Sequence, residues 1–269
     1  MKLVSATKLR KAQSGITKMR PYASKLKTIL SNLSGEIEDA ALAKYFEERE
    51  VSKVLVVVLT SDRGLCGAFN ANVVKKVKGL LNGKYKNLPK QQVTLMYCGK
   101  KGGDLLSKLG YVNDYSQVGI FQQLEANTAF DFAQHLLNRF VSGEFDRIEI
   151  VYNQFKNAAT QVVVPEQFLP VDLAELKGEE GPKNDYLFEP SKVEILEDLV
   201  PRSLKTQVYR MLLDSFASEH GARMVAMDKA TENAGDLLKA LRLAYNQARQ
   251  AAITKELSEI VGGAAALNG

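Results

Sequence analysis

The feature that most constrains this chain is a long C-terminal stretch without helix breakers. No proline occurs between Arg202 and Val261, so nothing there removes a backbone donor or forces the chain out of the α region. Most positions carry strong helix formers, as in LLKALRLAYNQARQAAITKELSEI. About sixty helical residues span about 90 Å, which exceeds the width of a compact domain. We therefore expect residues 201–269 to form one projecting helix that needs a partner along its length.

Apolar seams with heptad spacing occur at both ends of the chain. The N-terminal seam consists of Ile16, Met19, Ala23, Leu26, Leu30, Leu33, Ile37 and Ala40. The C-terminal seam consists of Leu238, Leu241, Tyr245, Ala248 and Ala252, and continues after a small shift of face with Ile253, Leu257, Ile260 and Ala264. Two such seams predict an antiparallel coiled coil closed by the residues between them. The alternative is two amphipathic helices packed separately on a globular core, which the length of the helices disfavours.

The central part of the chain alternates between strand and helix patterns. Residues 53–60, 91–98 and 145–152 read as strands, the first buried on both faces, and residues 159–164 as a hairpin partner of the third. Helices are expected at residues 71–81, 101–109 and 124–141. This alternation predicts a Rossmann-like α/β domain with a mostly parallel sheet. The first helix should run to about Glu48 with a bend at Pro21, which gives domains at 1–50, 51–190 and 191–269.

Composition excludes several classes of protein. The chain has 269 residues, 45% hydrophobic and 25% charged, as is typical of soluble folded proteins. No uncharged apolar run approaches the roughly 18 residues that a membrane-spanning helix needs. The N-terminus has no signal-peptide pattern, and Cys66 and Cys98 stand alone, which favours a reducing compartment.

Positive charge is concentrated at the N-terminus. The net charge is +5, and no acidic residue precedes Glu36. The basic residues of this segment are Lys2, Lys8, Arg10, Lys11, Lys18, Arg20, Lys25 and Lys27. Such a block indicates an acidic partner surface, nucleic acid or anionic lipid, unless it is merely a solvated helix face.

No set of residues predicts catalysis, a cofactor or a metal ion. The loop at residues 61–70 follows the first strand, where an α/β sheet places ligands, but its glycines fit no known phosphate-binding pattern, and neither does CGKKGGD at 98–104. Cys66 lies near Arg63 but has no neighbouring histidine in the sequence, so a packing or contact role is favoured. His135 and His220 have no second ligand three or four residues later in the sequence. Asp62 and Arg63 more often cap a turn than do acid–base chemistry, and we expect a protein without catalytic, cofactor or metal sites.

The C-terminal helix instead offers polar groups beside its seam. With Ile253 at zero on a helical wheel, Arg249 and Glu256 lie on one flank, and Gln250 and Thr254 lie on the other. Ordinary solvated flank residues would give the same pattern.

Three long segments carry a family resemblance. They are TSDRGLCGAFN at 60–70, ASEHGARMVAMDKATENA at 217–234 and YNQARQAAITKELSEIVGGAAAL at 245–267, and the opening MKLVSATKLRKAQ is similar as well. Together they resemble the γ subunit of F-type ATP synthase over essentially the whole chain. The resemblance implies a central rotor without catalytic sites, present once per α3β3 hexamer, which transmits torque between an ion-driven c ring and catalytic β subunits. It also implies a foot that rests with the ε subunit on the c ring, and a membrane association made only through the complex.

The same resemblance implies partner contacts for particular residues. Contacts with the hexamer are expected at Lys8, Arg10, Lys11, Asp62, Arg63, Cys66, Arg249, Gln250, Thr254 and Glu256. Contacts with the c ring are expected at Tyr186, Phe188 and Glu189. An acidic lever loop of the β subunits is the implied target of the basic N-terminal block.

Two departures from the family pattern affect the expected source. Met1 matches an internal methionine of the family, so we expect about twenty N-terminal residues to be missing from this sequence. Residues 171–184 contain no cysteine, unlike the regulatory insertion of chloroplast relatives. A bacterial rotor at the cytoplasmic face of the plasma membrane is therefore expected, with the mitochondrial inner membrane as the alternative.

Two rival functions remain open from the residues alone. A coiled-coil scaffold could bind nucleic acid through residues 1–35, with a strong dependence on salt. A small-molecule enzyme could use the α/β domain, and would then need a ligand at residues 61–70 and be stabilised by it.

Overall fold

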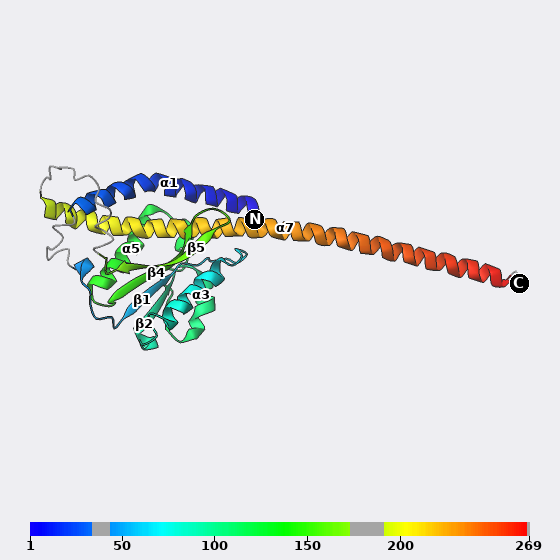
Figure 1. Cartoon of the computed structure of the whole chain (residues 1–269), viewed down its shortest axis with the longest axis horizontal. Coiled ribbons are helices and arrows are strands. Elements are labelled where there is room, and N and C mark those ends of the chain that lie inside the picture. Colours follow the sequence, from blue (N-terminus) through cyan, green and yellow to red (C-terminus); the bar gives the residue numbers. More distant parts are fainter. Residues whose placement is uncertain (34–43, 173–190, 268–269) are drawn as a thin grey trace. The chain divides into compact units, whose positions relative to one another are not determined.

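The computed structural model describes residues 1–33, 44–172 and 191–267 (Figure 1). The chain divides into two compact units, Met1–Val225 and Ala226–Gly269. The first unit holds helix α1 (Lys2–Leu33), the whole sheet and the first part of helix α7 (Lys192–Leu267), which continues through the second unit. The α/β class expected from the sequence is confirmed.

The five-stranded sheet has the order β3-β2-β1-β4-β5. Strands β1 (Val54–Val58), β2 (Val93–Tyr97), β3 (Val112–Asp114) and β4 (Arg147–Phe155) run parallel to one another. Strand β5 (Gln161–Leu169) returns antiparallel to β4, which confirms the expected hairpin. The sequence does not predict β3, because its 3 residues are too short to show a period of two.

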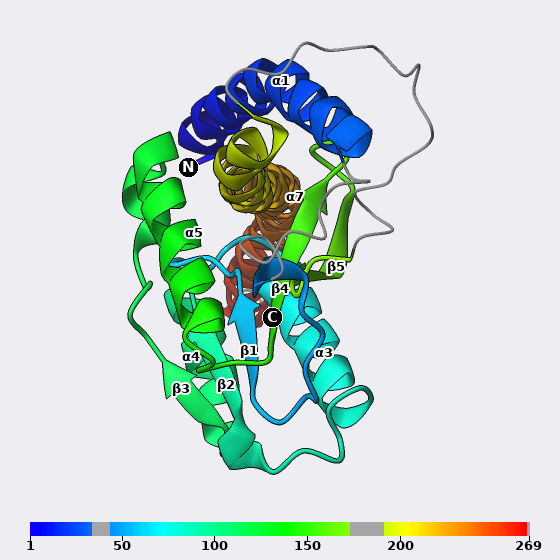
Figure 2. The ribbon, with the colours of Figure 1, turned by 90° about the vertical axis from the view of Figure 1, so that its left-hand side faces the viewer.

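Helices cover both faces of the sheet, as Figure 2 shows. Leu55 and Val57 of β1 pack toward α5 (Ala126–Val141) and α7, whereas Val54, Val56 and Val58 pack toward α3 (Phe69–Asn82) and α4 (Lys100–Leu106). All five side chains have 0% exposure. The prediction of a strand buried on both faces is therefore confirmed.

Helix α7 begins at Lys192, next to the expected domain boundary at residue 191 and before the helical stretch expected from about residue 201, and it passes through Pro201. Ser191 Oγ accepts a hydrogen bond from the backbone N–H of Glu194 at 3.3 Å, which caps the helix at this earlier position. Pro201 removes one backbone bond, but the buried side chains of Leu196, Val200 and Leu204 surround it. Their burial outweighs the lost bond, so the helix runs through the proline and extends beyond the stretch expected from about residue 201.

The partner of α1 is also different from the predicted one. Leu9, Ala12 and Ile16 form a buried cluster with Leu213 and Ala217 of α7. The C-terminal seam, by contrast, exposes its side chains, from 48% at Ile253 to 67% at Tyr245 and Ile260. The seam of α1 therefore finds its partner earlier in α7, because that part of the helix already packs on the sheet and completes one continuous core.

The two helices run antiparallel, as expected. Near the start of α1, Lys8 interacts electrostatically with Glu219. Further along, a Cβ at Gly15 would touch Leu213. Near the end of α1, Leu30 lines the same surface pocket as Leu204. Residue numbers in α7 thus fall as those in α1 rise. Figures 1 and 2 both show the two helices side by side over this region.

Helix α1 is continuous through Pro21, so this proline is not a boundary. The predicted extension to Glu48 crosses residues 34–43, which lie outside the described residues. Beyond this gap residues 44–46 are helical and residues 47–50 are not. Most of the expected loop at 171–184 also lies outside the described part of the chain.

Truncating Leu213 should test which part of α7 is the partner of α1. Leu213→Ala removes a side chain that is 5% exposed, and we expect unfolding of the full chain to require about 2–5 kcal/mol less free energy. Leu241→Ala is the matched control, because Leu241 is 58% exposed and its loss should change stability by about 0.5 kcal/mol or less. Urea unfolding of both variants measures this, and an equal loss at the two positions would contradict the observed pairing.

Candidate protein interaction sites

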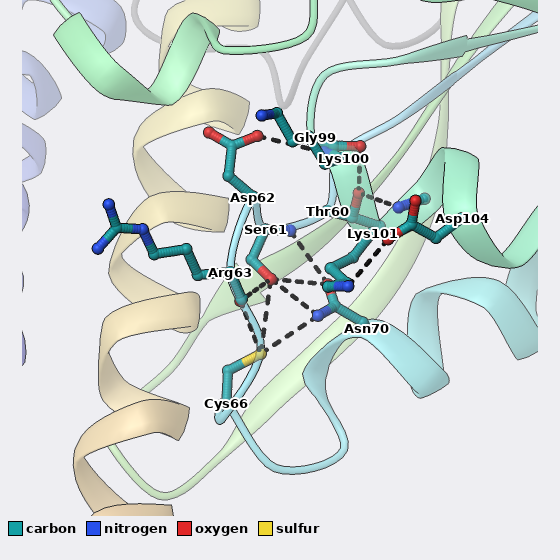
Figure 3. Close-up of polar contacts among 11 residues, drawn as sticks. Thr60, Ser61, Asp62, Arg63, Cys66, Asn70, Gly99, Lys100, Lys101 and Asp104 are labelled. Atoms are coloured by element: carbon teal, nitrogen blue, oxygen red, sulfur yellow. Dashed lines mark hydrogen bonds and ion pairs between the residues drawn. The ribbon is translucent and has the colours of Figure 1, made fainter.

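A hydrogen-bonded loop follows β1 at the carboxyl edge of the sheet, as Figure 3 shows. Ser61 N–H donates to Asn70 Oδ1 at 3.0 Å, and Asn70 Nδ2 donates to Ser61 Oγ at 2.8 Å and to Cys66 Sγ at 3.3 Å. Ser61 Oγ donates to the carbonyl of Arg63 at 2.7 Å. These bonds fold residues 61–70 back on the first turn of α3, and they hold Leu65 at a positive φ of 63°.

A second set of hydrogen bonds lies at the same edge of the sheet, between β1 and the start of α4. Thr60 Oγ1 donates to the carbonyl of Gly99 at 3.1 Å and accepts from Gly102 N–H at 2.8 Å. Asp62 Oδ1 accepts from the backbone N–H of Lys100 at 3.2 Å, so this carboxylate caps the start of α4. A Cβ at Gly99 would collide with the carbonyl oxygen of Thr60. Hydrogen bonds between protein groups therefore join the end of β1 to the start of α4, and Asp62 caps a turn as expected.

Arg223 of α7 ties this loop to the helix. Its guanidinium donates to the carbonyl of Arg63 at 3.0 Å and to the carbonyl of Gly64 at 3.3 Å. It also forms an ion pair with Glu219 at 2.7 Å and contacts His220 Nδ1 at 3.2 Å. Both partners in the ion pair have side chains that are 10% exposed, so the loop and the helix share one buried charged cluster.

The environment of this cluster shifts several pKa values. Burial, together with the positive charges of Arg223 and Lys8, lowers the pKa of His220 from 6.5 to about 3. Its ring is therefore neutral at physiological pH, and Nδ1 can accept from Arg223. Burial raises the pKa of Glu219 against the opposing attraction of Arg223. Earlier in α7, burial raises the pKa of Asp214 from 3.8 to about 6, against the attraction of Arg210 and Arg20.

The residues expected to contact the hexamer fall into separate groups. Lys8, Arg10 and Lys11 are exposed on α1. Lys8 of α1 and Asp62 of the loop both act electrostatically on Glu219. The structure therefore brings α1 and the loop to the same turn of α7. The Arg63 side chain is exposed. Cys66 is 2% exposed, so its side chain is packed within the loop, and any partner would meet its neighbours first.

The remaining predicted contacts lie elsewhere. Arg249, Gln250, Thr254 and Glu256 are exposed within the second unit, and Thr254 Oγ1 donates to the carbonyl of Gln250 at 2.9 Å. Tyr186, Phe188 and Glu189 lie outside the described residues.

Arg223 and Glu219 were not singled out from the sequence. Their spacing of four residues on a helix is typical of an ion pair, which was the available signal. The bonds from Arg223 to Arg63 and Gly64 span about 160 residues of sequence and leave no local pattern.

The residues that the structure describes contain no cluster of three potential metal ligands. Within the same ranges no helix is long and apolar enough to cross a bilayer. Cys66 and Cys98 are both free and buried.

The shifted pKa values of one base, His220, and one acid, Asp214, predict opposite effects of pH on stability. Between about pH 6 and pH 4, unfolding protonates His220, so its contribution to stability falls as pH falls; folding protonates Asp214, so its contribution rises. His220→Gln should therefore gain stability relative to the unmodified chain on acidification, and Asp214→Asn should lose it, each by up to about 1.4 kcal/mol per pH unit. Urea unfolding at several pH values checks this, and parallel stability curves for all three chains would contradict it.

Comparison with known proteins gives the family. A sequence model of the ATP synthase family matches residues 1–267. The ATP synthase gamma chain of Cytophaga hutchinsonii is 52% identical, and that of Flavobacterium johnsoniae 55%, each over all of this chain and 92% of the relative. A solved structure of the central stalk and c ring of Tetrahymena thermophila mitochondrial ATP synthase matches with a TM-score of 0.62 and 28% identity, over 86% of this chain and 97% of that one. A Euglena gracilis mitochondrial ATP synthase chain, with a TM-score of 0.60 and 23% identity over 97% of this chain and 95% of that one, shares the fold. The chain therefore belongs to the ATP synthase gamma chain family.

Proposed function

We propose that this chain is the central rotor shaft of an F-type ATP synthase and transmits torque between an ion-driven c ring and the catalytic sites. The observation that carries this function is the row of exposed apolar side chains on α7, in a chain that matches gamma subunits over its whole length. The row comprises Leu237, Leu238, Leu241, Leu243, Tyr245, Ile253, Leu257, Ile260 and Val261. Each is between 48% and 67% exposed, and so many large apolar side chains on one helix are typical of a surface that other chains cover.

The partners follow from this function. One copy of the chain would stand in an α3β3 hexamer, with the catalytic sites on β, and its globular part would meet the ε subunit and the c ring. Support comes from the Tetrahymena match, whose description names a central stalk with its c ring. The bacterial relatives favour the cytoplasmic face of a bacterial plasma membrane, where the chain would be peripheral and held by the complex.

Two sets of residues are proposed to touch the hexamer. Arg249, Gln250, Thr254 and Glu256 are exposed polar groups beside the apolar row, where they can form hydrogen bonds with surrounding subunits. The second set comprises Lys8, Arg10, Lys11, Asp62 and Arg63, with Cys66 buried behind the loop surface that a partner would meet. Its basic members are suited to an acidic loop of β, and the bonds from Arg223 to the loop fix that loop beside α1. Tyr186, Phe188 and Glu189 are proposed as contacts with the c ring.

Placing a charge in the apolar row should block assembly without unfolding the chain. Leu257 is 57% exposed, so Leu257→Asp should leave the unfolding transition of the isolated chain unchanged. Inside the hexamer the same carboxylate would lose its hydration, and we expect native mass spectrometry with α and β to show little complex. Ser258→Asp is the control with the same charge change at an adjacent exposed position. If Leu257→Asp and the unmodified chain assembled equally well, Leu257 would not be one of the residues that contact the hexamer.

Charge reversal on α1 should affect coupling more than folding. Arg10→Glu with Lys11→Glu changes two exposed side chains, whereas Lys8 is left intact because it also acts on Glu219. We expect ATP-driven ion pumping by the reassembled enzyme to fall several-fold, most clearly at low salt, while thermal unfolding of the chain is unchanged. The exposed Lys156→Glu provides a control away from α1. Normal pumping by the double variant at low salt would show that the basic block has no role in coupling.

A further inference from the structure

A second basic segment lies in the globular unit. Between Asp62 and Asp104 the sequence contains no acidic residue. The basic residues in this interval are Arg63, Lys75, Lys76, Lys78, Lys84, Lys86, Lys90, Lys100 and Lys101. An interval of one sign over this length produces a positive potential that the modest net charge of the chain does not reveal.

Helix α3 turns this charge outward. Val73, Val77 and Leu81 face the core, which leaves Lys75, Lys76 and Lys78 on the exposed side. Among the described residues no ion pair or side-chain hydrogen bond involves these three lysines or Lys86. Their charges are therefore available to a partner.

A groove of about 510 Å³ runs between α3 and strand β5. Lys75, Lys76 and Lys84 line it from the α3 side, and Val163 and Pro165 line it from β5. Gly79 and Leu80 also line the groove, and a Cβ at Gly79 would meet no atom within 4 Å. The groove thus combines a basic wall with an apolar one and has open space over the glycine.

Lys84 is held in place by a buried carboxylate. Lys84 Nζ and Tyr85 Oη both donate to Glu149 Oε1, and Glu149 is 2% exposed. Glu149 offsets the charge of Lys84 and fixes its position at one end of the groove. Within the described part of the chain, Lys75 and Lys76 then remain as the unpaired cations that line the groove.

We propose that this groove, lined by Lys75, Lys76, Gly79, Leu80, Val163 and Pro165, docks an acidic segment of a partner polypeptide. Carboxylates would pair with Lys75 and Lys76, and small apolar side chains of the same segment would pack on Leu80 and Val163. The groove includes none of the residues assigned above to the hexamer or the c ring, so this docking goes beyond the rotor function.

The lining favours a polypeptide with side-chain contacts over other occupants. Among the residues that the structure describes, no aromatic side chain on which a nucleic acid base could stack lines the groove. Pro165 lies in β5, which is an edge strand of the sheet, and it has no N–H to donate to an added strand. Binding through charged and small apolar side chains is the mode that remains for this surface.

The test uses the purified full chain and a fluorescein-labelled peptide of glutamate and leucine as the probe. Fluorescence anisotropy should show binding that weakens as salt rises to about 0.15 M. Lys75→Glu with Lys76→Glu should lower the affinity roughly tenfold. Gly79→Gln should also lower it with no change of charge, because the new side chain enters the groove; thermal unfolding confirms that each variant is folded.

The matched control is Lys78→Glu with Lys86→Glu, which makes the same charge change on exposed residues that do not line the groove. It should retain affinity within about twofold if the groove is the site. Equal losses in the two double variants would overturn the proposal in favour of non-specific attraction, and so would the absence of any binding at low salt. Tighter binding of a DNA duplex, with the same variant pattern, would overturn it in favour of nucleic acid. Native mass spectrometry with α and β measures rotor assembly separately from peptide binding. A failure of the rotor function and a failure of the groove proposal can therefore be told apart.

Discussion

Burial of the first part of α7 is the interaction on which the rest of the structure depends. From Leu196 to Ala217 this helix places one apolar side chain after another in the core, against the sheet, α5 and α1. A helix of 76 residues gains little stability from intrinsic propensity alone, and such helices are normally held by the packing of a face. The buried part therefore anchors the whole element, and it also gives α1 the surface on which it packs.

The charged cluster at Arg223 extends this anchoring to the loop after β1. An isolated carboxylate as buried as Glu219 would be costly, and its ion pair with Arg223 offsets much of that cost. The same guanidinium satisfies loop carbonyls, and the neutral ring of His220 accepts from it. Removal of one member would leave the others buried without partners, so these residues act together.

The sequence predicts the regular elements well because their signals are local. The β-branched run at 53–60 and the period of α5 depend on neighbouring residues, and both appear as predicted. The helical stretch was expected only from about residue 201, because a local rule about proline cannot take account of the burial of Val200 and Leu204 around Pro201. The partner of the α1 seam was misassigned for a related reason: residues 204–217 carry both a surface for the sheet and a surface for α1, so they show no simple heptad seam.

The continuity of α7 bears on how a twist would pass along it. Each backbone hydrogen bond between successive turns resists rotation of one turn against the next, and a proline removes one such bond. The only proline within α7 is Pro201, and there the buried side chains of the core support the backbone. In the second unit, where side chains are exposed, the helix contains no proline, and its bonding pattern continues to Leu267. The weak point in torsional stiffness thus lies where packing can compensate for it, and the exposed part keeps the stiffness that its own backbone provides.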